Sequence, residues 1–201
     1  MSSKRYKIIA FKAALMLFFL LCGGLSTSRA QDAKIEKEER IKAKEVPGNA
    51  KSWLRDAYEG RKKVRWYRET NESGYSIEAK FSWEGSFHSI EFDELGMIID
   101  IEIERDIDEL SSAAREGLKS YFESLDKFRL LKIQQQYSGK PDDLEDFIDE
   151  DEQDAIAIRF EVEFYASRDG DYRLWEGLFD ATGQLISIRR IIQRPTDNLD
   201  Y

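Results

Sequence analysis

The chain has 201 residues, of which 41% are apolar and 12% aromatic, so it can bury one sizeable core or two small ones and is not disordered throughout. It carries 40 acidic against 31 basic residues, a formal net charge of −9. This balance argues against a nucleic-acid partner, because neutralised phosphates supply most of that affinity.

Residues 1–30 are typical of a secretory signal peptide. A basic start is followed by an uncharged apolar run, Ala13 to Leu21. Small residues in Ser28-Arg29-Ala30 occupy the two positions that a signal peptidase inspects, so the mature chain is predicted to begin at Gln31. A retained membrane anchor is the alternative, but a span needs roughly 18 apolar residues.

The predicted cleavage changes the chemistry of the chain. It removes five basic residues and no acidic ones, which leaves 26 basic and 40 acidic residues, a net charge of −14. It also removes Cys22, the only cysteine. Acylation of Cys22 in a lipoprotein would favour a small residue in place of Leu21 before it. We therefore expect a periplasmic or secreted protein without thiol chemistry, and without a membrane span after cleavage, whose charge favours cationic partners.

Residues 31–45 are almost all charged, and we interpret them as a solvated leader or short helix outside the core. Apolar residues then recur at helical spacing and predict a helix over about 47–59, which Gly60 ends.

Beyond this helix the apolar period changes to 2. It predicts four strands, at about 64–67, 75–83, 87–92 and 97–104. One helix on a four-stranded meander is a complete half-buried unit, so residues 46–105 form a predicted first repeat.

The same order of elements begins again at residue 106. A helix is predicted over about 111–124, with Ser111 or Ser112 as its N-cap. Strands follow at about 128–136, 156–165, 172–179 and 185–192. Residues 106–194 are therefore a predicted second repeat, whose extra length is the acidic insertion 138–154. Residues 195–201 form a polar tail.

Each predicted repeat contains a Phe-Asp-x-x-Gly turn between its last two strands. The turns are Phe92 to Gly96 and Phe179 to Gly183. An Asp at the start of a tight turn bonds forward to backbone N–H groups, and the Gly takes a positive φ. We interpret both motifs as structural.

The order of these elements resembles a known group of proteins. Val46-Pro47 opening a helix, the strand Val64 to Tyr67, the strand beginning Tyr75-Ser76-Ile77, and the Phe92 to Gly96 turn are similar to the PepSY-like secreted proteins of Bacteroidetes type, also called β-lactamase-inhibitor-like. The resemblance is good over residues 46–104, weaker over 110–192, and rests on order and doubling. It implies an α+β fold of two tandem repeats, secretion and a non-catalytic binding role. An activity against a β-lactamase does not follow from a similar fold.

The sequence offers little for catalysis. His88 is the only histidine, and it lies within a predicted strand without a nucleophile motif. Phosphate-binding glycine loops are absent from the sequence. Carboxylates are too abundant for pairs of them to indicate a glycosidase. We expect no enzyme activity and no cofactor, with calcium as the one open exception.

The acidic insertion is the candidate metal site. Calcium prefers six to eight oxygen ligands from closely spaced carboxylates in a flexible loop, although the spacing here is not that of an EF-hand. A solvated charged segment is the competing interpretation. The predicted ligands are Asp142, Asp143, Glu145, Asp146, Asp149 and Asp151.

The aromatic residues divide by strand phase. Those predicted for the core are Trp66, Phe81, Trp83, Phe92, Phe160, Phe164 and Phe179. Others fall out of phase, on the side of the sheets that the helices leave open, where aromatics with arginines suit protein binding. This predicted partner-binding set is Tyr67, Phe87, Tyr165, Tyr172, Arg159 and Arg173. Packing of the two repeats against each other through this side is the alternative.

Together these patterns predict a non-catalytic periplasmic binding module for a protein or peptide, one that restrains an extracytoplasmic hydrolase. The alternative function is a calcium-binding or calcium-responsive periplasmic protein that uses residues 142–154.

Overall fold

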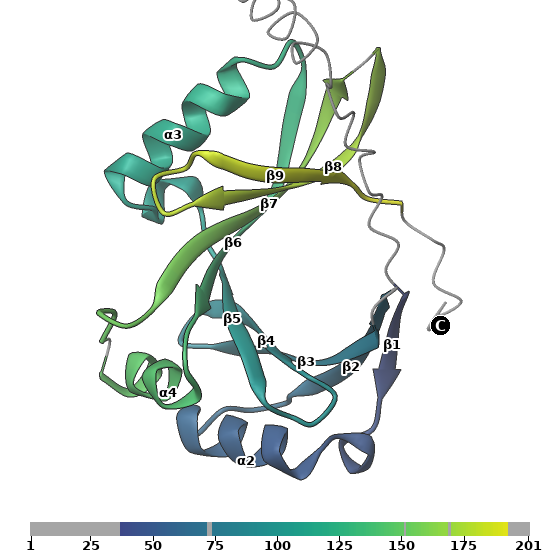
Figure 1. Ribbon diagram of the computed structural model, residues 1–201, viewed down its shortest axis with the longest axis vertical. Coiled ribbons are helices and arrows are strands. Elements are labelled where there is room, and N and C mark those ends of the chain that lie inside the picture. The colour runs from purple at the N-terminus through teal and green to yellow at the C-terminus, as the bar shows by residue number, and fades with distance from the viewer. Residues whose placement is uncertain (1–36, 72–73, 151, 169, 193–201) are drawn as a thin grey trace, which may run out of the picture. The chain divides into compact units, whose positions relative to one another are not determined.

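The computed structural model describes residues 37–71, 74–150, 152–168 and 170–192. The predicted signal peptide, residues 31–36 of the charged leader and the predicted tail lie outside these residues. The described chain is α+β, with nine antiparallel strands in one sheet and three α-helices (Figure 1). None of the described helices is long and apolar enough to cross a membrane.

The strands pair in chain order, so the sheet is a continuous meander. They are β1 (Lys37–Ile41), β2 (Arg65–Asn71), β3 (Gly74–Trp83), β4 (Ser86–Phe92), β5 (Ile98–Glu104), β6 (Phe128–Ser138), β7 (Ala157–Arg168), β8 (Asp171–Asp180) and β9 (Leu185–Arg190). The α-helices are α2 (Gly48–Ala57), α3 (Ser112–Glu123) and α4 (Pro141–Glu150), and two 3₁₀ turns are η1 (Ala43–Glu45) and η2 (Ile107–Glu109).

In chain order α2 precedes β2–β5, and α3 precedes β6–β9 with α4 inserted between β6 and β7. The two sets do not form separate sheets, because β5 pairs with β6 through the register Glu102 to Gln136. The two halves are therefore parts of one sheet and not two separate sheets stacked on each other. All nine strands belong to one sheet, which has two faces.

The helices α2 and α3 cover the same face of this sheet. α2 buries Ala50, Leu54 and Ala57, and its cluster includes Ile101 of β5. α3 buries Leu118 among a second set of core residues. The register joins the two clusters on one side, because Ile101 pairs with Tyr137 and Tyr137 pairs with Ile158, which contacts both clusters.

The charged leader is partly a strand, which corrects the expectation of a solvated segment. β1 pairs with β2, and Ile41 is buried at 8% exposure. Its neighbours are charged because β1 lies at the edge of the sheet, where charged side chains discourage pairing with another chain. Because Ile41 is the single apolar residue of β1, the sequence shows no alternation that would indicate a strand.

The acidic insertion is also ordered differently from the expectation of a loop. Its centre is the helix α4, whose Leu144 and Phe147 are buried in the core beside α2. The Phe147 ring stacks on Tyr137 with 4.3 Å between centroids. The indole N–H of Trp53 donates to the Pro141 carbonyl at 3.2 Å. The apolar residues at a spacing of three were the signal for this helix.

The two Phe-Asp-x-x-Gly turns have the predicted structure. Asp93 Oδ1 accepts from the backbone N–H of Leu95 at 2.9 Å and of Met97 at 2.8 Å. Asp180 Oδ1 accepts from Thr182 and Gln184 in the same pattern. These bonds satisfy turn N–H groups that have no strand partner.

The turn glycines also allow close packing against the helices. Gly96 and Gly183 have φ of +81° and +76°. A Cβ at Gly96 would lie 2.8 Å from the Ala50 nitrogen of α2, and a Cβ at Gly183 would lie 2.4 Å from the Ala114 oxygen of α3. Each turn is thus pressed against the first turns of the helix of its own half.

Replacing Gly183 by alanine tests this contact. Gly183→Ala is expected to lower the free energy of unfolding by about 2–4 kcal/mol, since a positive φ and a backbone clash both oppose the new methyl group. The matched control is Gly170→Ala, where φ is +86° and no atom lies within 4 Å of the added Cβ. It is expected to cost about 1 kcal/mol. Equal losses for the two variants in urea unfolding would contradict a steric role for the contact.

The role of α4 in the core has its own test. Phe147→Ala should destabilise the protein by about 3–5 kcal/mol, the range for a buried aromatic. Asp146→Ala, an exposed neighbour on the same helix, should leave the urea midpoint nearly unchanged. If this segment were a loop without packing, Phe147→Ala and Asp146→Ala would have similar urea midpoints.

Candidate functional site

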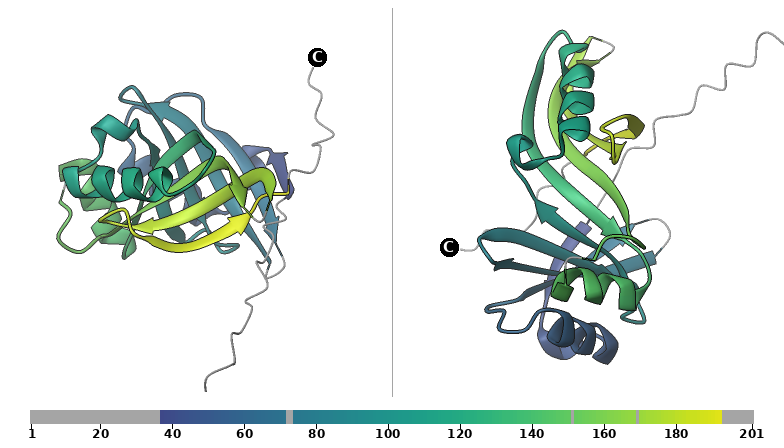
Figure 2. Two further views of the ribbon diagram at one scale, coloured as in Figure 1. Left: turned by 90° about the horizontal axis from the view of Figure 1, so that it is seen from above. Right: turned by 90° about the vertical axis from the view of Figure 1, so that its left-hand side faces the viewer.

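The face of the sheet opposite the helices is the candidate site, and we call it the helix-free face. Its side chains alternate along the strands with the core residues, as Tyr67 does with Trp66 and Glu161 does with Val162. Among the described residues, no helix lies on it, and the sheet curves around it (Figure 1; Figure 2). Strands from both halves contribute to this surface.

Five carboxylates meet at the centre of the helix-free face. We call them the acidic floor: Glu78, Glu91, Asp100, Glu102 and Glu161. Glu78 pairs with Glu91 across β3 and β4, and Glu91 pairs with Asp100 across β4 and β5. Glu161 of β7 lies on the same face, separated from β5 by the strand β6.

Amides and a hydroxyl of neighbouring strands hold part of the acidic floor. Gln136 Nε2 donates to Asp100 Oδ2 at 3.0 Å, and Gln134 Nε2 donates to Glu102 Oε2 at 2.6 Å. The Ser89 hydroxyl donates to Glu78 Oε1. Because both glutamines come from β6, the second half of the sheet orients carboxylates of the first half.

Burial and mutual repulsion perturb these carboxylates. Burial, followed by the charges of Glu91, Glu161 and Glu78, raises the pKa of Asp100 to about 8, and the hydrogen bond from Gln136 acts in the opposite direction. Burial likewise raises the pKa of Glu102, followed by the charges of Glu161, Asp100 and Glu78. A pKa of about 8 means that Asp100 is largely protonated at neutral pH.

Two lysines partly compensate the acidic floor, and both have other partners. Lys80 Nζ lies 2.8 Å from Glu78 and 3.2 Å from Glu38. Burial lowers the pKa of Lys80, but the two carboxylates outweigh burial and raise it overall. Lys132 Nζ lies 2.7 Å from Glu163, outside the floor. Fixed positive charge is therefore scarcer here than carboxylate.

Aromatic side chains flank the acidic floor on both sides. Tyr165 and Tyr172 stack with 5.7 Å between their ring centroids, and the Arg129 guanidinium lies 5.5 Å from the Tyr165 ring. On the other flank the Lys80 ammonium lies 5.2 Å from the Tyr67 ring. Tyr172 is 52% exposed and offers the largest of these aromatic surfaces.

The structure places five of the six predicted partner-binding residues on the helix-free face. Tyr165 and Tyr172 are brought together, whereas Tyr67 and Phe87 lie on the strands of the first half. Arg159 pairs with Gln136 beside the acidic floor. The placement of Arg173 is wrong: it pairs with Ala166, whose side chain is in the core, and its guanidinium bonds to Asp171.

Sequence reasoning missed the acidic floor. Asp100 and Glu102 alternate with isoleucines in β5, a pattern that indicated the solvent side of a half-buried strand. Asp100 is instead only 5% exposed. The curvature of a nine-stranded sheet, which crowds the side chains on its inner face, has no local signal in the sequence.

The predicted calcium ligands have a different setting from the expected flexible loop. Those from Asp142 to Asp149 lie on the helix α4, and Asp151 lies outside the described residues. Within the described part of the chain, no three His, Cys, Asp or Glu side chains form a group that could hold a metal ion. The calcium site stays a prediction that this geometry does not support.

His88 has the structural role that its strand position indicates. It is 3% exposed, and its Nδ1 shares a hydrogen bond of 3.1 Å with the Tyr58 hydroxyl. Burial, followed by the charge of Arg105, lowers the pKa of His88 to about 4. A neutral, enclosed imidazole among aromatic rings is part of the core.

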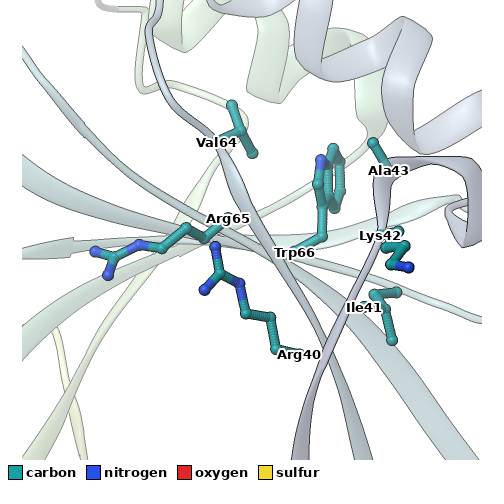
Figure 3. Close-up of a pocket in the computed structure, with 7 residues that line it drawn as sticks. All are labelled: Arg40, Ile41, Lys42, Ala43, Val64, Arg65 and Trp66. Carbon is teal, nitrogen blue, oxygen red and sulfur yellow. The ribbon is translucent and has the colours of Figure 1, made fainter. Parts of the chain in front are cut away.

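A pocket of about 510 Å³ opens at the β1 edge of the sheet. Its lining residues are Arg40, Ile41, Lys42, Ala43, Val64, Arg65 and Trp66 (Figure 3). Arg40 pairs with Tyr67 and Arg65 pairs with Lys80, so both arginines belong to the helix-free face. This edge is basic, in contrast to the acidic floor.

Comparisons with known proteins give structural neighbours only. No protein-family model and no curated protein matches the sequence. A DUF2874 family protein from Bacteroides ovatus superposes with a TM-score of 0.52 at 14% identity, covering 72% of this chain and 87% of that chain. A DUF2874 family protein from Bacteroides uniformis gives 0.50 at 14% identity, with coverages of 72% and 89%.

The chain shares the fold of these two DUF2874 proteins. A BLIP-like protein from Bacteroides fragilis superposes with a TM-score of 0.48 at 14% identity, covering 76% of this chain and 90% of that chain. The expected α+β fold is confirmed at this coarse level. The PepSY name and any function stay predictions, because function resides in sites and not in folds.

The buried Asp100 makes stability depend on pH. Its pKa is higher in the folded state than in the unfolded chain, so the bound proton stabilises the fold at low pH, and this contribution is lost as pH rises from about 4 to about 8. The free energy of unfolding should fall over this range by up to about 1.4 kcal/mol for each pH unit. Asp100→Asn should give a shallower decline and greater stability at pH 8.

The control for this prediction is Asp142→Asn, which removes an exposed carboxylate of α4. Its urea unfolding between pH 5 and pH 8 should parallel that of the unmodified protein. Parallel curves for Asp100→Asn would instead show that Asp100 ionises normally.

Proposed function

We propose that this protein is a non-catalytic binding module that docks a protein or peptide on its helix-free face. The observation that carries the proposal is the combination on this face of exposed and half-buried tyrosines with a sheet surface that no described helix covers. A stacked aromatic pair such as the half-buried Tyr165 and the exposed Tyr172 is a typical anchor of protein interfaces.

The chemistry of the described residues supports binding over catalysis. The only histidine is enclosed in the core, so no imidazole lies beside the acidic floor to act as a general base. The 510 Å³ pocket at the β1 edge is basic and carries no carboxylate. These features favour a surface that recognises a partner.

The proposed compartment is the periplasm or the outside of the cell. The signal-peptide pattern of residues 1–30, which predicts cleavage before Gln31, supports this proposal. An extracytoplasmic hydrolase is the partner class that the family resemblance implies. The proposed action is to cover part of such an enzyme.

We also propose that the two halves arose as tandem repeats. Each half has one helix before four strands, and each presses a Phe-Asp-x-x-Gly turn against that helix. Gly96 meets Ala50 and Gly183 meets Ala114, which are equivalent positions of α2 and α3. β1 and α4 are then additions to the repeated unit.

The tyrosines provide the test of the proposed function. The mature protein is used to isolate its partner from the periplasm of its source, and the purified partner is then titrated against variants. Tyr165→Ala with Tyr172→Ala should weaken binding at least tenfold, or about 1.4 kcal/mol, because a stacked aromatic anchor is lost.

The matched control is Tyr75→Ala. Tyr75 is exposed to 38%, but it alternates with Ser76 and Glu78 and so lies on the helix-bearing face. It should leave affinity unchanged. Equal weakening by both sets of variants, or binding unaffected by either, would contradict docking on the helix-free face.

A further inference from the structure

We propose that the acidic floor receives a basic side chain, an arginine or a lysine, of the partner that docks on the helix-free face. This inference rests on the proposed function and specifies the chemistry of its partner. The occupant follows from charge complementarity: the acidic floor gathers five carboxylates of four strands, whereas only one of the two nearest lysines pairs with it, Lys80 at 2.8 Å from Glu78, and Lys132 pairs with Glu163 instead.

A buried oxygen without a partner points to the same occupant. Asp100 is 95% buried, and its Oδ1 has no hydrogen-bond partner among the described residues. The hydroxyl of Ser76, two residues before Glu78 on the same face, is also buried without one. A buried oxygen that accepts no hydrogen bond destabilises an interface. A guanidinium has five N–H donors and can donate to several such oxygens at once.

The surroundings of the acidic floor favour a side chain over a free metal ion. No three acidic or histidine side chains of the described chain form a metal site. The stacked tyrosines on one flank and Tyr67 on the other would contact the apolar stem and neighbours of a long basic side chain. A partner loop with a central arginine or lysine fits this arrangement.

The charged groups that face Asp100 decide how binding depends on pH. They are Glu78 and Lys80 of β3, Glu91 of β4, Glu102 of β5, Lys132 of β6, and Arg159, Glu161 and Glu163 of β7. Carboxylates outnumber cations in this set. Without a partner, burial and repulsion raise the pKa of Asp100 to about 8, so it retains a proton near neutral pH, and they raise the pKa of Glu102 as well. A docked cation favours the ionised carboxylates, so its binding releases a proton.

The pH dependence of binding distinguishes this site from general attraction to an acidic protein. A hexa-arginine peptide is the probe, because guanidinium groups stay charged throughout the range and only the protein can release protons. Calorimetric titration of the mature protein at pH 6, 7 and 8 should show affinity rising with pH, up to tenfold for each unit if one proton is displaced. Heats measured in two buffers of different ionisation enthalpy report that proton directly.

Two pairs of substitutions provide the matched comparison. Asp100→Asn with Glu102→Gln removes two acidic groups from the floor and should abolish both the pH dependence and the released proton. Asp142→Asn with Asp146→Asn also removes two acidic groups, but from the exposed side of α4. This control pair should preserve the pH dependence and the released proton. Circular dichroism establishes that each variant is folded, and the single Glu102→Gln variant repeats the measurement if the pair is not.

Several results would overturn the inference. They are an affinity independent of pH, equal weakening by the two pairs, or competition by calcium at micromolar concentration, which would make the floor an ion site. Separately, the periplasmic partner should lose affinity when the floor is altered. If that partner binds through the tyrosines but tolerates Asp100→Asn with Glu102→Gln, the proposed function stands and this inference fails.

Discussion

The contact between each Phe-Asp-x-x-Gly turn and its helix is the constraint on which the architecture depends. Gly96 and Gly183 have no side chain, so the turn backbone approaches Ala50 and Ala114 at distances that a Cβ would forbid. Asp93 and Asp180 hold the turns by accepting backbone N–H groups. Because both turns tie their helices to the same face of one continuous sheet, the opposite face stays without a helix in the described chain.

That asymmetry explains why charge accumulates on one side of the sheet. The helix-bearing face takes most of the apolar residues of the strands, and the alternation of a strand sends most of the charged ones to the other face. Curvature then crowds these polar groups until Asp100 is as buried as a core residue. Burying carboxylates near one another destabilises their ionised form, which is why the pKa of Asp100 is about 8. A cationic partner would remove this penalty.

The sequence predicted the parts of the fold whose signals are local and periodic. Alternation located β3 to β5 and β7, helical spacing located α2 and α3, and the Asp-x-x-Gly turns had the expected bonds. β1 and α4 were missed because their charged residues outnumber the few apolar ones that pack, Ile41 in one and Leu144 and Phe147 in the other. Tertiary packing decided the structure of both segments. The acidic floor was missed because it depends on the register across four strands and on the curvature of the sheet. Neither can be predicted from a single segment of the sequence.

The union of β5 with β6 matters most for the site. Glu78, Glu91, Asp100 and Glu102 come from the first half, whereas Glu161 and the amides of Gln134 and Gln136 come from the second. In the first half alone, β5 would be an exposed sheet edge, where water would solvate Asp100 and Glu102 and their pKa values would stay nearer those of free side chains. Joining the halves buries this edge and adds the charge of Glu161. The perturbed chemistry of the helix-free face is thus a property of the joined sheet, and it arises at the seam between two units that are otherwise built alike.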